Sequence, residues 1–205
     1  MNEAKIRLSA KEAELVANAD WILTKNEVIK KAKHLLEWIM EEQQQVLRSF
    51  KLPGNLTRSS PKISKGENYK GLPYLVLDYP RYFDKENIAA IRTMFWWGNF
   101  FSITLHLSGK SKKKYESSVS SAYSLFKQQD CFCCTGNDQW EHHFETGYYT
   151  PVKIMDEKEF GKILAEKAFI KIAKKYSLKE WNAVVPQLLK DFDLFVNLLN
   201  GERSN

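Results

Sequence analysis

The stretch LPYLVLDYPRYFDKENIAAIRTMFWWGNFFSITLHL, residues 72–107, decides the fold. It is rich in the β-branched and aromatic residues that favour strands, and turn residues mark its breaks. Gly98-Asn99 separates two β-rich runs, and a pair that begins with Gly favours a two-residue hairpin turn because Gly tolerates positive φ. The stretch therefore predicts three antiparallel strands, the last two joined by a tight hairpin.

The register of this hairpin determines which way Arg92 faces. A two-residue turn at Gly98-Asn99 pairs Thr93 with Thr104. Alternation along the strands then places Arg92 on an otherwise apolar face that should meet the helices. An unpaired buried charge costs on the order of several kcal/mol, so Arg92 needs an acidic partner, and Asp78 in the preceding strand is the natural candidate. A register shift of one residue would instead place Arg92 on the wetter face.

Two interpretations of these strand residues stay open. Arg92 and Asp78 could form a structural ion pair, or the guanidinium could bind an anion or a carboxylate. Trp97, next to Trp96, could line a pocket or an interface, because adjacent strand residues point to opposite faces. The candidate ligand-binding set is Arg92, Asp78, Trp97 and His106.

The segment from Cys131 to His143 suggests a second kind of site. A hairpin turn at Gly136-Asn137 would place Cys131, Cys133 and His142 on one side of a β-ribbon. Thiolate and imidazole are ligands that zinc prefers. The spacing matches no standard zinc motif and lacks a fourth ligand, so we expect no bound metal, and no cofactor motif occurs elsewhere. A Cys–His nucleophile pair is a further alternative without a recognisable activating arrangement.

Composition limits the classes of protein that the chain can belong to. The 205 residues are 43% hydrophobic and 13% aromatic, which is enough for a substantial core. No apolar run approaches the ~20 residues that cross a bilayer, and the N-terminus lacks a signal-peptide core. The net charge of +6 is distributed over helices and mixed with acids, which disfavours a nucleic-acid partner. We therefore expect a cytoplasmic protein without a membrane partner, and a homo-oligomer stays open.

The remaining patterns predict an α+β fold. Capping boxes at Ser9/Glu12 and Thr24/Glu27 start helices over residues 1–50, and the polar stretch 51–71 predicts a linker or loop. Residues 72–205 hold the sheet and the C-terminal helices, with a helix from Asp156 to about Tyr176. We expect one α+β domain over residues 1–205, with an antiparallel sheet of about four to six strands and the element order ααβββαββαα.

The stretches Leu77-Asp78-Tyr79-Pro80 and Arg92–Gly98 resemble uncharacterised bacterial proteins of similar length. The resemblance implies a bacterial, single-domain protein of unknown function, and it carries over no catalytic residue. From the residues themselves we expect a domain that binds an unknown small molecule or a protein through its aromatic-rich sheet. The alternative is an enzyme whose cleft is built around Arg92, Asp78 and His106, or around the Cys/His ribbon.

Overall fold

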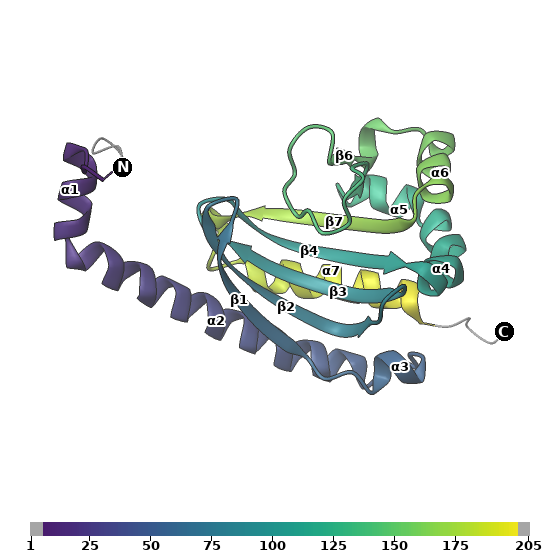
Figure 1. Ribbon diagram of the computed structural model, residues 1–205. Helices are drawn as coiled ribbons and strands as arrows, with labels where there is room; N and C mark the ends of the chain where they lie inside the picture. Colours follow the sequence, from purple (N-terminus) through teal and green to yellow (C-terminus); the bar gives the residue numbers. More distant parts are fainter. Residues whose placement is uncertain (1–5, 201–205) are drawn as a thin grey trace.

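The computed structural model describes residues 6–200 and contains one seven-stranded sheet with helices on one face (Figure 1). All strand pairs are antiparallel, and the strand order is β1-β2-β3-β4-β7-β5-β6. The strands are β1 (Lys62–Tyr69), β2 (Leu72–Phe83), β3 (Ile88–Trp96), β4 (Phe100–Ser108), β5 (Phe132–Cys134), β6 (Tyr149–Pro151) and β7 (Phe169–Ser177). The helices are α1 (Ala10–Ala17), α2 (Ala19–Leu47), α3 (Gly54–Thr57), α4 (Gly109–Ser121), α5 (Tyr123–Gln128), α6 (Glu157–Glu166) and α7 (Val184–Leu199), with short 3₁₀ turns η2 (Val152–Ile154) and η3 (Leu178–Glu180).

The α+β class and the antiparallel sheet are confirmed, but the predicted number of strands is too low. Residues 51–71, predicted as a linker or loop, contain α3 and the edge strand β1. The helix predicted from Asp156 to Tyr176 ends at Glu166, and Phe169–Ser177 forms β7 in the interior of the sheet. Ile170 and Ile172 alternate with Lys171 there, and this period of two prevails over the helical pattern that precedes it.

The β3–β4 hairpin forms as predicted, but its register is shifted by one residue. Trp96 pairs with Phe100, so that three residues and not two make the turn. Asn99 N donates to Trp96 O at 3.1 Å, and Gly98 has φ +70° at the third position of this turn, where a type II turn needs a positive φ. The shift places Arg92 on the face opposite to the helices, and the predicted inward orientation was wrong.

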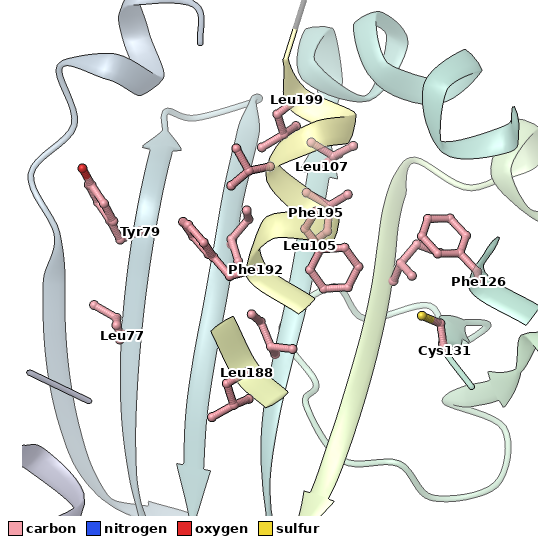
Figure 2. Close-up of a cluster of buried hydrophobic side chains, with 14 of the residues drawn as sticks. Leu77, Tyr79, Leu105, Leu107, Phe126, Cys131, Leu188, Phe192, Phe195 and Leu199 are labelled. Carbon is pink, nitrogen blue, oxygen red and sulfur yellow. The ribbon is translucent and has the colours of Figure 1, made fainter. Parts of the chain in front are cut away.

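The helix-covered face of the sheet holds the main core. Alternate residues of β2, β3, β4 and β7 meet α7 and the second half of α2. Figure 2 shows α7 lying over the strands with Leu188, Phe192, Phe195 and Leu199 turned toward them, and all four side chains are fully buried. Apolar residues at spacings of three and four give α7 the single stripe that this packing requires. Pro186 lies in the first turn of α7, where the amide that it lacks has no helical partner.

The other face of the sheet is covered by an irregular loop, residues 135–148, between β5 and β6. The loop replaces the tight turn predicted at Gly136-Asn137, because β5 pairs with Tyr149–Pro151 and not with the residues around His142. Phe144 anchors it by stacking on Tyr149 with ring centroids 4.5 Å apart. The long loop therefore brings polar side chains over the sheet where a short ribbon could not.

The N-terminal helices begin at side-chain caps. Ser9 and Glu12 form the predicted capping box of α1. The start predicted at Thr24 is wrong, because α2 already begins at Ala19 with Asn18 as its cap. The first part of α2 and all of α1 extend beyond the sheet (Figure 1). Among the described residues, no helix is both long and apolar enough to cross a membrane.

Candidate functional site

Polar side chains gather on the loop-covered face of the sheet. We call five of them the covered polar cluster: Asp78, Arg92, His106 and Lys171 from the strands, and His142 from the loop. Sheet register places Asp78 opposite Arg92, and His106 opposite Lys171. Ala90 and Ala173 occupy neighbouring positions on this face, and their small side chains leave room for the loop residues.

Arg92 makes the contact with Asp78 that the sequence predicts. Its Nε and Nη2 donate to the two carboxylate oxygens of Asp78 at 2.7 Å and 2.9 Å. Its Nη1 lies 2.9 Å from Nε2 of His142. A guanidinium can only donate, so Nε2 accepts and His142 is neutral. Burial and the nearby charges of Lys171 and Arg92 agree with this assignment, because they hold the pKa of His142 well below its usual range.

Lys171 is the most unusual member of the cluster. The residue is only 1% exposed, and its ammonium donates to the backbone oxygens of Gln139 (3.0 Å) and Glu141 in the loop. Among residues 6–200, no carboxylate oxygen lies within 4.0 Å of this nitrogen. Burial lowers the pKa of Lys171 to about 8. A buried cation thus faces neutral oxygens that belong to an irregular segment.

His106 connects the cluster to the loop and is neutral near pH 7. Its Nε2 lies 3.1 Å from Oε1 of Gln139, and its ring meets the ring of Trp140 edge-on with centroids 5.7 Å apart. Burial, and then the charge of Lys171, lower the pKa of His106 to about 3. The imidazole can therefore donate or accept a hydrogen bond to a ligand without contributing charge.

Tyr69, the last residue of β1, holds the loop on the sheet. Its hydroxyl donates to Oε2 of Glu141 at 2.7 Å and accepts from the backbone amides of His142 (2.7 Å) and His143 (3.1 Å). Burial raises the pKa of Tyr69 far above its usual value, so the hydroxyl stays protonated. This single side chain fixes three consecutive loop residues over Arg92.

An open cavity adjoins the cluster where the loop meets the start of β7. Its volume is about 430 Å³, and Gln139, Trp140, Lys167 and Phe169 are among the residues that line it. The ring of Phe169 also lies against His106, with centroids 6.2 Å apart. Gln139 therefore both lines the cavity and contacts His106.

The other candidate residues lie elsewhere. Trp97 packs on the helix-covered side, where its ring meets Phe95 edge-on at 6.4 Å. Cys131 and Cys133 belong to the main core, and burial raises the pKa of each thiol to about 12. His142 is on the opposite face, so the three residues of the metal hypothesis do not meet. Among the described residues, no group of three or more His, Cys, Asp or Glu side chains could hold a metal ion.

Comparison with family models, with curated proteins and with solved structures finds no match to this chain. The site must therefore be interpreted from its own geometry. Three candidates from the sequence (Asp78, Arg92 and His106) come together, and His142 joins them from the metal hypothesis. Sequence reasoning missed Lys171 and Tyr69. The alternation Ile170-Lys171-Ile172 is the signal that could have revealed the lysine, since it places one charge between two buried strand positions.

Proposed function

We propose that this protein binds a small anionic ligand, with phosphate or carboxylate oxygens, on the loop-covered face between Arg92 and Lys171. The single observation that carries the proposal is the environment of Lys171, a buried ammonium whose hydrogen bonds within residues 6–200 all go to backbone oxygens of the loop. Burying a charge without a counter-charge is costly, and a Met side chain of similar length could fill the same space without that cost. A cation retained under these conditions points to a function.

The loop carbonyls stand where ligand oxygens would bind. The carbonyls of Gln139 and Glu141 occupy two of the three donor positions of Lys171. An anionic oxygen makes a stronger hydrogen bond to an ammonium than a neutral carbonyl does. A ligand that displaces the segment 139–141 therefore replaces weaker hydrogen bonds of Lys171 with stronger ones. Arg92 supplies a second cation, and His106 a neutral donor, once His142 and Gln139 move aside.

Binding fits these residues better than catalysis does. Both carboxylate oxygens of Asp78 accept from Arg92, which leaves this acid poorly placed to act as a general base. The thiols of Cys131 and Cys133 are protonated near pH 7, because burial raises the pKa of each to about 12. Neither Asp78 nor these two thiols therefore supply a free base or an activated nucleophile at the ligand position.

Calorimetric titration with inorganic phosphate and with citrate, at constant ionic strength, tests the proposal. The wild type is compared with Lys171→Met and with Lys175→Met, a control on the same face of β7 whose side chain is exposed. We expect one of the two anions to bind the wild type and the control, and Lys171→Met to weaken binding by at least ~10-fold, as the loss of a charge-assisted hydrogen bond of about 1.5–3 kcal/mol implies. Absence of binding to the wild type by both anions, or equal binding by both variants, would contradict it.

A further inference from the structure

The first helical residues form an apolar surface that nothing in residues 6–200 covers. We call residues 6–28 the N-terminal arm; it consists of the residues before α1, then α1 itself and the start of α2. Every residue from Ile6 to Thr24 is exposed. Seven of the eleven large apolar side chains that are exposed in the described chain lie in this arm: Ile6, Leu8, Leu15, Val16, Trp21, Ile22 and Leu23. Large apolar patches on a protein surface mark interaction sites.

The arm continues a stripe of α2 that elsewhere forms part of the core. Trp21 precedes Val28 by seven residues and Ala32 by eleven, so the three side chains lie on one face of the helix. Ala32 is fully buried against the body of the protein, Val28 is half-buried, and Trp21 is 54% exposed. The ion pair between Lys25 and Glu67 of β1 (2.7 Å) marks where α2 leaves the sheet. The helix of 29 residues thus extends beyond the surface on which its apolar face packs (Figure 1).

The charge of the arm indicates what kind of surface can cover it. The arm contains three basic residues and four acidic ones, a net charge of −1, whereas the whole chain carries +6. Helices that lie on membranes are rich in Lys and Arg and are attracted by anionic lipids, and this arm is not basic. Two such arms can approach each other with little repulsion, because the net charge of each is close to zero. Each arm also carries charges of both signs, so basic residues of one arm can face acidic residues of the other.

The shape and area of the arm fit another helical arm. Trp21, Ile22 and Leu23 are consecutive, so they cover about 200° of the helix circumference, and a partner must contact the helix on more than one side. A flat surface cannot do so, but a helical bundle can. The seven exposed side chains each present on the order of 100 Å². Together they approach the ~800 Å² that each partner buries in a stable interface of standard size.

We propose that the N-terminal arm is a dimerisation surface, and that a second copy of this chain packs its own arm against it about a two-fold axis. A two-fold axis lets the same patch serve on both sides, and the closed pair leaves neither arm exposed. The result is a small helical bundle formed by α1 and the start of α2 of both copies. The surface is separate from the covered polar cluster, so this proposal does not depend on anion binding.

Sedimentation velocity and light scattering on the full chain, over a wide range of concentrations, test the proposal. The test variant is Trp21→Glu, and the control is Trp38→Glu, which alters the same residue type on the same helix at 53% exposure but outside the arm. We expect the wild type and the control to be dimers. Trp21→Glu should weaken dimerisation by at least ~30-fold, the factor that corresponds to a hot-spot loss of about 2 kcal/mol. Circular dichroism should show that both variants are folded, because neither side chain belongs to the core.

Three results would overturn the proposal. The first is a wild-type chain that stays monomeric up to the highest attainable concentration. The second is a dimer that Trp21→Glu leaves as tight as the wild type, since the interface then lies elsewhere. The third is a monomer that binds vesicles of phosphatidylcholine and phosphatidylserine through Trp21, which assigns the arm to a lipid surface.

Discussion

The guanidinium of Arg92 holds both carboxylate oxygens of Asp78, at 2.7 Å and 2.9 Å, and turns its remaining nitrogen to His142 at 2.9 Å. The three groups come from β2, β3 and the covering loop, so this contact joins the loop to the centre of the sheet. Because the arginine is fixed on two sides, its orientation is set before any ligand arrives.

Removing Asp78 should lower the free energy of unfolding more than removing Arg92 does. Asp78→Ala leaves a half-buried guanidinium without its counter-charge, and we expect the free energy of unfolding to fall by about 3 kcal/mol. Arg92→Met should be tolerated better, because the remaining carboxylate can take up a proton. Urea denaturation at neutral pH measures both. Equal and negligible losses would show that the pair does not stabilise the sheet.

Acid should destabilise the protein through its covered histidines. Burial lowers the pKa of His106 to about 3, while the unfolded chain titrates near the ordinary value of about 6.5. Between these values the unfolded state binds more protons, so the free energy of unfolding falls as pH falls below about 6.5. His106→Gln should flatten this dependence of stability on pH, measured by thermal unfolding across the range. His34→Gln, which alters an exposed histidine on α2, should leave the profile unchanged.

Replacing Gly109 or Gly161 with Ala should change the stability of the protein in opposite directions. Gly109 has φ +57°, and a Cβ atom there would lie 2.3 Å from the carbonyl oxygen of Glu86, so Gly109→Ala should destabilise by at least ~1 kcal/mol. Gly161 lies inside α6 with no atom within 4 Å of the added Cβ, and Gly161→Ala should stabilise by about 0.5–1 kcal/mol. Thermal unfolding of the two variants in parallel checks the sign of each effect.

The cysteines should not bind zinc. Cys131 and His142 lie on different faces of the sheet, and the thiols are protonated because burial raises their pKa. Elemental analysis of protein purified without added metal should find no stoichiometric zinc, and a chelator should leave the melting temperature unchanged. Close to one zinc per chain, lost in Cys131→Ser, would contradict this account.

The local patterns predicted three central strands but missed β1 and β7, and they did not give the register of the hairpin. Alternating apolar residues and the turn residues placed β2, β3 and β4 correctly, and the pairing of Asp78 with Arg92 followed from adjacent strands. The register depended on where Gly98 sits within its turn. A type II turn places Gly one position later than a two-residue hairpin does, and that single step moved Arg92 to the other face.

The candidate site was only partly predictable because its parts meet through long-range contacts. Lys171 and Arg92 are far apart in the sequence and approach each other only because β4 lies between β3 and β7. The loop 135–148 has no periodic pattern, and its position depends on contacts such as that between Tyr69 and Glu141. Residue types alone could not show that loop carbonyls would face a buried lysine.

The most direct test of the central claim, that Lys171 is retained to bind an anion, is the free energy of unfolding at pH 7 with and without the anion, phosphate or citrate, that binds the wild type. A ligand that binds only the folded state at ten times its Kd stabilises by about 1.4 kcal/mol. We expect this gain in the wild type and in Lys175→Met. Lys171→Met should be at least as stable as the wild type without the anion, because it removes a buried charge, and should gain at most about 0.4 kcal/mol at the same anion concentration, because its binding is at least ~10-fold weaker. A Lys171→Met protein that is several kcal/mol less stable, or that gains as much from the anion as the wild type, would contradict the account.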